Sequence, residues 1–155
     1  MKPNIKKLLI SLGIPLAVGG LSALLSGSMT GFRELDAPPL TPPGWVFPVV
    51  WSILYLLMGY ASYRVVTSEA GQKQKRNALI FYGLQLFFNF LWPMVFFRLE
   101  LRLTAFWILL TLWGLILVTM RQFYKIDERA GDLLIPYFLW VTFAGYLNLG
   151  FFLEN

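Results

Sequence analysis

The stretch LTAFWILLTLWGLILVTM, which runs from Leu103 to Met120, has 18 residues and no charged side chain. An α-helix needs about 20 mostly apolar residues to cross the roughly 30 Å hydrocarbon core of a bilayer. Four more uncharged stretches of 19 to 21 residues accompany it, at 8–26, 44–63, 77–97 and 133–153. The sequence therefore predicts an all-α integral membrane bundle of five transmembrane helices.

The composition supports the same fold class independently. Hydrophobic residues make up 57% of the 155-residue chain and charged residues 14%, against roughly 25% charged in soluble domains. The longest connections, about 27–43 and 64–76, are too short to fold alone. We therefore expect a single five-helix transmembrane domain over residues 1–155.

The first apolar segment follows three lysines, as the core of a secretory signal peptide would. It is longer than the roughly 7 to 15 residues of such a core, and no clear small-x-small cleavage site follows, so we expect a retained helix. The chain contains no cysteine and no histidine. This excludes disulfides, thiolate nucleophiles, Cys/His zinc sites and the usual axial haem ligands, and no metal site is expected.

Lysine and arginine are divided unevenly between the two sides of the predicted bundle. One side receives ten (Lys2, Lys6, Lys7, Arg64, Lys73, Lys75, Arg76, Arg121, Lys125 and Arg129) and the other three (Arg33, Arg98 and Arg102). Basic loops favour the cytoplasmic side, so we expect the N-terminus in the cytoplasm and the C-terminus outside the cell membrane. The same residues suit contact with the lipid bilayer, and without a soluble basic module no nucleic acid partner is expected.

Polar side chains share one face of the third predicted span. Gln85, Asn89 and Trp92 follow one another at i, i+4 and i+7. An unpaired amide in hydrocarbon costs several kcal/mol, so this face must turn toward protein, water or a ligand.

The other spans carry comparable faces. The fifth has Tyr137, Trp140, Ala144 and Asn148, the second has Trp51 and Tyr55, and the fourth has Thr104, Trp107 and Thr111. Two interpretations remain open at this point. The amides either bridge neighbouring helices, at about 1 kcal/mol each, or they converge on an apolar pocket for a flat hydrophobic molecule. Four aromatic residues near span ends, including Tyr137 of the fifth-span face, are interpreted mostly as interfacial anchors: Trp45, Tyr63, Tyr124 and Tyr137.

The segment APPLTPPGWVFPVVW, from Ala37 to Trp51, has five prolines within eleven residues. Proline fixes φ and removes a backbone donor, so residues 38–43 should run extended across the mouth of the bundle, where they could serve as a lid. Pro43 is expected where a helix begins.

This proline-tryptophan segment resembles the tryptophan-rich sensory protein or translocator protein family, also called the peripheral benzodiazepine receptor family. Three further stretches match: WSILYLLMGYASY at 51–63, QLFFNFLWP at 85–93 with Phe96-Phe97, and PYFLW at 136–140 with Leu147-Asn148. The resemblance covers essentially the whole chain, and the order and spacing of the motifs make it specific. The chain is identified as a bacterial member of this family.

The resemblance implies a five-helix bundle, commonly a homodimer, with a pocket for porphyrins and for benzodiazepine-type or isoquinoline carboxamide ligands. No cofactor is required, and protoporphyrin IX is the expected ligand or substrate. By position in the motifs, the implied ligand-binding residues are Pro42, Pro43, Trp45, Phe47, Trp51, Tyr55, Asn89, Trp92, Trp140, Ala144 and Asn148. Some members degrade protoporphyrin in light, and Trp51 and Trp140 would be catalytic if that photochemical reading holds.

The match to the family has gaps. Leu40 stands where many members have tryptophan, and no Lys or Arg follows Tyr146, so the cholesterol-recognition pattern of animal members is absent. Tetrapyrroles are therefore the expected ligand class, and Arg33 is the candidate cation for their carboxylates. Three function classes stay open: a binding or sensory receptor, a light-dependent porphyrin-degrading enzyme, and a tetrapyrrole carrier. The absence of ionisable residues within the spans disfavours ion-coupled transport.

Small residues recur along the first span at three- or four-residue spacing. One set is Gly13, Ala17 and Gly20, and the other is Gly19, Ala23 and Gly27. Such spacing lets helix backbones approach closely, either between two subunits of a homodimer or within one subunit. The sequence does not choose between these two uses.

Overall fold

A computed structural model describes residues 4–27 and 36–155 of the chain. All elements assigned within these residues are helices: α1 (Ile5–Leu25), α3 (Val46–Val66), α4 (Gln72–Pro93), the π-helical turn η1 (Met94–Arg98), α5 (Arg102–Ile126), α6 (Glu128–Leu133) and α7 (Ile135–Glu154). Five helical segments are long and apolar enough to cross a membrane, with η1 continuing α4 and α6 leading into α7. The predicted all-α class and the five candidate spans are confirmed.

The helices extend beyond the uncharged stretches into charged flanks. α4 begins at Gln72 and so includes Lys73, whereas the uncharged stretch begins at residue 77, and α5 continues to Ile126. Basic side chains at helix ends reach toward the headgroups, so charge does not stop a helix at the membrane surface. The expected helix start at Pro43 is wrong, because α3 begins at Val46, whose N–H donates to the Pro43 carbonyl at 3.0 Å.

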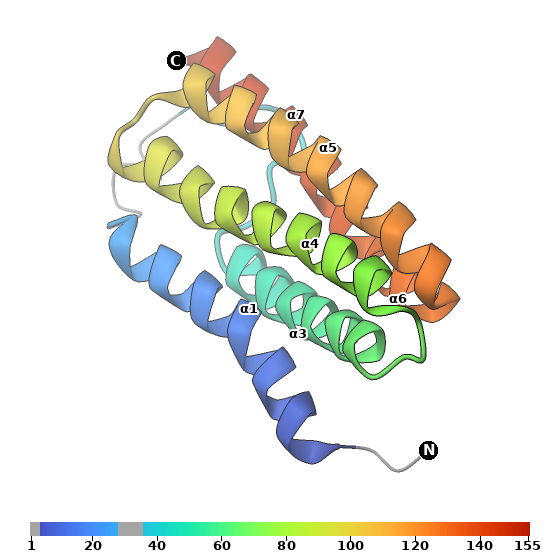
Figure 1. Cartoon of the computed structure of the whole chain (residues 1–155). Coiled ribbons are helices and arrows are strands. Elements are labelled where there is room, and N and C mark those ends of the chain that lie inside the picture. Colours follow the sequence, from blue (N-terminus) through green and yellow to red (C-terminus); the bar gives the residue numbers. More distant parts are fainter. Residues whose placement is uncertain (1–3, 28–35) are drawn as a thin grey trace.

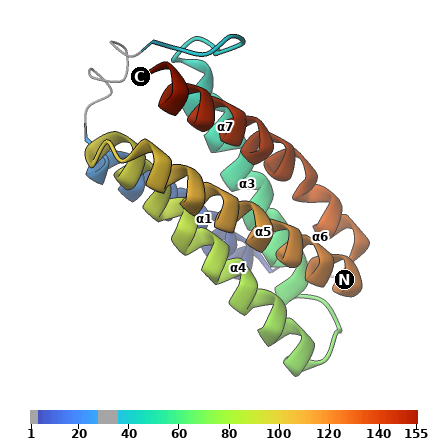
Figure 2. The ribbon, with the colours of Figure 1, turned by 90° about the horizontal axis from the view of Figure 1, so that it is seen from above.

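The long helices form a ring (Figures 1 and 2). α1 packs against α3 and α4, α4 against α5, and α5 against α7. Aromatic rings connect α3 to α7, with centroids 5.9 Å apart for Phe47 and Trp140 and 6.2 Å apart for Trp51 and Tyr137. We call the end where α1 and α4 begin the basic end, and the end where α3 begins and α7 finishes the proline-loop end.

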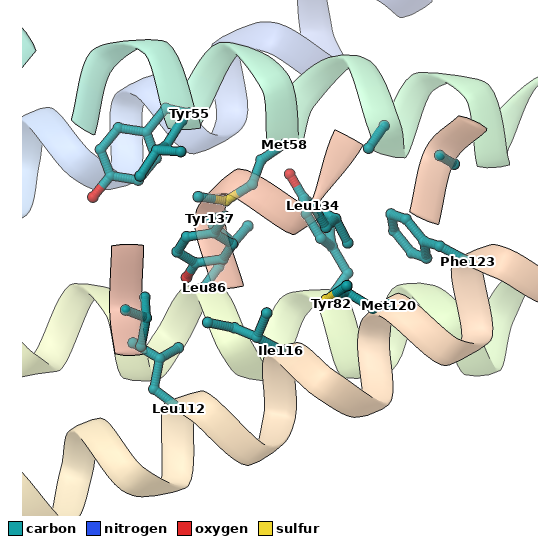
Figure 3. Packing of buried hydrophobic residues seen from close by; sticks show 14 of the residues in the cluster. Tyr55, Met58, Tyr82, Leu86, Leu112, Ile116, Met120, Phe123, Leu134 and Tyr137 are labelled. Atoms are coloured by element: carbon teal, nitrogen blue, oxygen red, sulfur yellow. The ribbon is translucent and has the colours of Figure 1, made fainter. Parts of the chain in front are cut away.

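Large side chains fill the bundle from its middle to the basic end. Met58 of α3, Leu86 of α4, Ile116 of α5 and Tyr137 of α7 meet there, as Figure 3 shows. Nearer the basic end, Arg64 Nε lies 2.7 Å from Asp127 Oδ2 and so joins the end of α3 to the start of α6. The space inside the bundle therefore lies toward the proline-loop end.

A close backbone approach joins α1 to α3. A Cβ atom added at Gly59 would lie 2.6 Å from the Ser11 carbonyl oxygen and 2.7 Å from Leu12 Cα. At the same contact, the Ser62 hydroxyl stays on its own helix, donating to the Gly59 carbonyl at 2.8 Å. Glycine at position 59 is therefore needed for the two helices to pack this closely.

The two sets of small residues in α1 lie in different environments. Gly19 faces the inside of the bundle, where an added Cβ would overlap the Tyr55 ring, and Ala23 lines the same interior space. Gly13 and Gly20 have open space where a Cβ would be, and Ala17 is exposed. Within the described residues, Gly19 serves packing inside one subunit, Gly27 has open space where a Cβ would be, and Gly13, Ala17 and Gly20 are free to meet another surface.

Pro93 ends the regular hydrogen-bond ladder of α4. Proline has no N–H, so it cannot donate to the carbonyl of Asn89 four residues earlier. The chain then widens into the π-turn Met94–Arg98, in which the Leu99 N–H donates to the Met94 carbonyl at 3.0 Å. This wider turn places Phe96 and Phe97 together, with ring centroids 4.8 Å apart.

The described part of the proline-rich loop lies along the last turns of α7. The Tyr146 hydroxyl donates to the Pro39 carbonyl at 2.6 Å, and the Asn155 side chain pairs with the backbone of Asp36 at 3.0 and 3.2 Å. Pro38 is buried against Gly150, whose added Cβ would lie 2.5 Å from Pro38 Cβ. The loop is thus fastened to α7 at three points.

Candidate functional site: an aromatic cavity

A cavity of about 220 Å³ lies inside the bundle toward the proline-loop end. Residues of all five spans line it, and its surface is mostly apolar, with aromatic rings and a few polar atoms. Its walls include the last turns of α1 through Ser22 and Ser26, and the first turn of α3 through Phe47 and Pro48. The cavity is therefore enclosed by helix ends that are far apart in the sequence.

Eight of the eleven sequence-predicted ligand-binding residues line this cavity. They are Phe47, Trp51, Tyr55, Asn89, Trp92, Trp140, Ala144 and Asn148. Pro42, Pro43 and Trp45 are not in its wall, and the Trp45 side chain is 69% exposed. The structure brings the first group together around one space, and the binding roles of all eleven residues stay predictions.

Stacked and edge-on rings build the aromatic wall. Trp51 lies against Tyr55 of the same helix, with centroids 5.6 Å apart and planes at 29°, because the two residues are one turn apart. Trp140 meets Phe47 edge-on at 65°. Offset and edge-on arrangements suit the electrostatics of aromatic rings, so these contacts hold the ring planes in place.

A buried hydrogen-bond network connects α3, α4 and α7 beneath this wall. The Tyr55 hydroxyl donates to Asn89 Oδ1 at 2.7 Å, and Asn89 Nδ2 donates to the Tyr137 hydroxyl at 2.8 Å. The Tyr137 hydroxyl donates in turn to Gln85 Oε1 at 2.7 Å. The amides of the third span thus bridge helices, and Asn89 also lines the cavity, so the two interpretations of its face are compatible.

Tyr137 corrects one expectation from the sequence. Its side chain is 1% exposed and lies at the centre of the network, so it is not an interfacial anchor. It shares the helical face of Trp140 and Ala144, at i+3 and i+7, and that spacing carried the correct signal. The position of Tyr137 near the end of a predicted span was the misleading signal.

A second polar bridge lies nearer the proline-loop end. Trp92 Nε1 donates to Asn148 Oδ1 at 2.9 Å, and Asn148 Nδ2 donates to the Arg102 carbonyl at 2.8 Å. The amide of Asn148 therefore holds the Trp92 ring in the cavity wall and also joins α7 to the backbone at the start of α5. Asn148 is 1% exposed, so both bonds are shielded from solvent.

Trp140 differs from Trp92 in its polar atom. Trp140 Nε1 is buried and has no hydrogen-bond acceptor among the described residues. A buried N–H donor without a partner is uncommon, because the lost hydrogen bond costs about 1–3 kcal/mol. Trp140 also lines the cavity, so this unpartnered donor belongs to a residue of the cavity wall.

The fourth span contributes to the wall through residues that the sequence did not single out. Leu109 and Leu112 line the cavity, whereas Trp107 is 60% exposed on the outer surface. The expected Thr104, Trp107 and Thr111 face therefore does not meet the other three. Trp107 belongs with the many lipid-facing apolar side chains, and polar-aromatic spacing alone did not distinguish the two sides of α5.

Several other residues that line the cavity were not predicted as site residues from the sequence. Gly19 lies in the wall beside Tyr55, and Ser22 donates from its hydroxyl to the Phe90 carbonyl at 2.8 Å. The small-residue spacing of α1 was a usable signal for Gly19, although it did not show which side of the helix faced inward. Phe151 closes the cavity from α7 without a distinguishing sequence signal.

The expected cation for an acidic ligand, Arg33, lies outside the described residues. Arg102, on the same side of the predicted membrane, is described, and its guanidinium carbon lies 5.8 Å from the centroid of Phe96, a cavity-wall residue. Its Nε is buried and has no hydrogen-bond partner among the described residues. A cation with an unused donor therefore lies behind one wall of the cavity.

Fold and cavity together define a class of protein: a five-span membrane bundle that encloses an aromatic cavity. A family model described as the TspO/MBR family matches residues 11–153. The chain belongs to this family.

Individual relatives agree with this assignment. The chain is 40% identical over 117 residues to a tryptophan-rich sensory protein of Cereibacter sphaeroides, which covers 76% of this chain and 72% of the relative. It is 32% identical over 150 residues to the tryptophan-rich protein TspO of Chlorobaculum tepidum, covering 96% and 95%. The translocator protein of Bos taurus is 35% identical over 129 residues, covering 81% and 76%.

Proposed function

We propose that the protein binds protoporphyrin IX or a similar tetrapyrrole in the aromatic cavity and acts as a sensory or regulatory protein of the membrane. The observation that carries the proposal is the buried, unpartnered indole N–H of Trp140 in a wall built mostly of apolar side chains and rings. Apolar pockets with a few placed polar groups are typical of sites for flat hydrophobic ligands. Benzodiazepine-type and isoquinoline carboxamide molecules share this chemistry and are proposed as further ligands.

The acidic groups of a porphyrin need a cation near the cavity. Arg102 supports the proposal because its guanidinium lies against Phe96 and retains a buried, unused Nε donor. Guanidinium groups bind carboxylates through paired, charge-assisted hydrogen bonds. A propionate at the proline-loop end of the cavity would satisfy this donor, while the ring system lies among the aromatic residues.

Binding of a macrocycle requires the cavity to widen. Its volume of about 220 Å³ lies below the roughly 300–1,000 Å³ of typical small-molecule sites. The proline-loop end is the proposed place of entry, because the bundle is solidly packed around Met58 and Ile116 toward the basic end. The same packing opposes passage of a ligand through the bundle. It therefore favours a receptor function over a carrier function.

Light-dependent degradation of the bound porphyrin is the second candidate. It is favoured by the positions of Trp51, stacked on Tyr55, and of Trp140, which together place two indoles in the cavity wall. Light-excited porphyrin could take an electron from an indole or form reactive oxygen from O₂, with the walls confining the attack to the macrocycle. This reaction needs no general base.

One experiment separates the two candidates. Purified protein is titrated with protoporphyrin IX in the dark, following tryptophan quenching, and the saturated complex is then illuminated in air while porphyrin absorption is recorded. Saturable binding with bleaching no faster than that of free porphyrin supports a receptor. Protein-dependent bleaching to a defined product, lost in Trp51→Phe or Trp140→Phe variants that still bind, supports an enzyme. Absence of saturable binding contradicts both.

We also propose that the protein lies in the cell membrane as a homodimer, with its N-terminus in the cytoplasm. The unequal distribution of basic residues supports the orientation, and the exposed Gly13, Ala17 and Gly20 surface of α1 supports a helix contact between subunits. Because the chain has no cysteine, single Glu69→Cys and Glu154→Cys variants report the orientation cleanly. A membrane-impermeant maleimide added to intact cells should label only the second.

A further inference from the structure

A second hollow lies at the basic end of the bundle, remote from the aromatic cavity. It is a groove of about 760 Å³ between the first turns of α1, the end of α3 and the start of α4. Its wall contains four basic residues, Lys7, Lys73, Lys75 and Arg76, and the apolar residues Leu79 and Ile80. The proposed tetrapyrrole site uses none of these side chains.

Contacts between the three helices hold the groove in shape. The Asn4 N–H donates to the Tyr63 hydroxyl at 3.0 Å, which fixes the start of α1 to the end of α3. Lys75 Nζ donates to the Val66 carbonyl at 3.1 Å, which fixes the start of α4 to the same end of α3. Lys75 is therefore a structural part of the groove, and the other three cations are available to a ligand.

The groove has a strong and uncompensated positive charge. Its described wall contains no acidic residue, and none of its four cations forms an ion pair within residues 4–27 and 36–155. Glu69 is exposed in the connection between α3 and α4 and is not in the wall. α4 also has Gly71 as its N-cap residue, with no side-chain cap and no acidic residue in the first turn, so its first N–H groups add partial positive charge.

The wall changes from charged to apolar along α4. Ile80 lies seven residues after Lys73, which is about 10 Å along a helix axis. Its side chain is 52% exposed, and it follows Arg76 by one turn on the same face. A ligand that fits this groove thus has an anionic head at the membrane surface and an apolar part that continues toward the hydrocarbon.

We propose that this groove binds one anionic phospholipid, with its phosphate among Lys7, Lys73 and Arg76 and an acyl chain along Leu79 and Ile80. Basic pockets between transmembrane helices are suited to lipid headgroups, and each basic residue near the surface raises the affinity for anionic lipid roughly fivefold. A soluble phosphate would share the charged part of the site. The apolar continuation of the wall favours the lipid.

A test uses the full-length protein, delipidated in a neutral detergent and titrated with a phosphatidylglycerol. Bound lipid is counted by native mass spectrometry, and the shift in unfolding temperature is followed in parallel. Phosphatidylcholine tests the need for negative charge, and glycerol phosphate and inorganic phosphate test the need for acyl chains. We expect saturable binding of one phosphatidylglycerol and weaker binding of the other three probes.

Matched variants separate the groove from the general charge of this end of the bundle. The triple variant Lys7→Gln, Lys73→Gln, Arg76→Gln should bind phosphatidylglycerol roughly a hundredfold more weakly, and Lys73→Gln alone roughly fivefold. The control Arg121→Gln, Lys125→Gln, Arg129→Gln removes the same charge from exposed positions at the same end and should bind like the parent. An equal loss in the control, equal binding of phosphatidylcholine, or equal binding of free phosphate would overturn the proposal.

Discussion

At the scale of single residues, the donor of Trp140 is the most informative atom of the cavity. Its indole N–H has no acceptor among the described residues, whereas the N–H of Trp92 is used by Asn148. The two tryptophans of the same wall therefore differ in hydrogen bonding. The Trp92 indole is held by Asn148, whereas the Trp140 N–H has no partner among the described residues.

Trp140→Phe should weaken dark binding of protoporphyrin IX by about three- to tenfold, because it removes one hydrogen-bond donor worth about 1 kcal/mol while keeping an aromatic ring. The measurement is the dissociation constant from fluorescence titration. Trp107→Phe is the control, since Trp107 is exposed on the outer surface of α5. If the two variants bind alike, the indole donor of Trp140 plays no part in binding.

Asn89→Leu should lower the free energy of unfolding by about 1–2 kcal/mol. The substitution leaves the Tyr55 hydroxyl without its acceptor and removes the donor to Tyr137, and hydrogen bonds inside membrane bundles contribute about 0.6 kcal/mol each on average and at most about 1.7 kcal/mol. Thermal or denaturant unfolding in detergent measures the change. Asn77→Leu, an exposed position on the same helix, should change stability little, and an equal effect at both positions would contradict the role of the network.

At the scale of helices, the sequence predicted that five spans exist better than it predicted where each helix begins and ends. The absence of charge over about 20 residues was sufficient to place five spans, because hydrocarbon excludes unpaired charge. It could not give their ends, since Lys73 and Lys125 continue helices into the headgroup region. The short helix α6 was not expected either. It lies between two apolar stretches, and its N-cap residue is Asp127, whose side chain accepts the Arg129 N–H.

The contact between α1 and α3 gives a prediction at this scale. Gly59→Ala should destabilise the protein by about 1–3 kcal/mol, because the new Cβ would meet the backbone of α1 at Ser11 and Leu12, which cannot yield as a side chain can. Unfolding in detergent measures the cost. Gly83→Ala, where the added Cβ has open space, should be neutral or slightly stabilising, and a destabilisation at position 83 of equal size would contradict the explanation.

The contacts that fasten the proline-rich loop to α7 give a second prediction at the scale of helices. Tyr146→Phe removes the hydrogen bond to the Pro39 carbonyl and should speed both binding and release of protoporphyrin IX about fivefold, corresponding to about 1 kcal/mol less resistance to opening. Stopped-flow tryptophan quenching measures both rates. Tyr60→Phe, on the outer face of α3, should leave the rates unchanged. Unchanged rates in the first variant would show that the loop does not control access.

At the scale of the whole molecule, the cavity walls that could be predicted were those whose residues are spaced along one face of a helix. Trp51 with Tyr55, and Trp140 with Ala144 and Asn148, lie on single faces, so the α3 and α7 walls followed from the sequence. The contribution of α1 to the wall could not be predicted from the sequence, because choosing between Gly13 and Gly19 requires knowing which side of α1 meets α3. The prediction of the α5 wall was wrong for a similar reason. Lipid and the protein interior are equally apolar, so both favour the same residue types on a helix surface.

The hydrogen-bond network was the least predictable part of the interior. The sequence showed that Gln85 and Asn89 had to be satisfied, but the partners Tyr55 and Tyr137 come from two other helices. Pairing between helices depends on their relative rotation and depth, and neither quantity is encoded in a local pattern. The division of the interior into a packed part and a hollow part depends on the same quantities.

Filling the cavity tests the central claim of this account most directly. Ala144 lines the cavity, so Ala144→Leu adds three carbon atoms inside it, whereas Ala17→Leu adds the same atoms on the exposed face of α1. Both variants are titrated in the dark with protoporphyrin IX under the conditions used for the parent protein. We expect at least a tenfold loss of affinity in Ala144→Leu and none in Ala17→Leu. Parent-like binding by Ala144→Leu would contradict binding in the aromatic cavity.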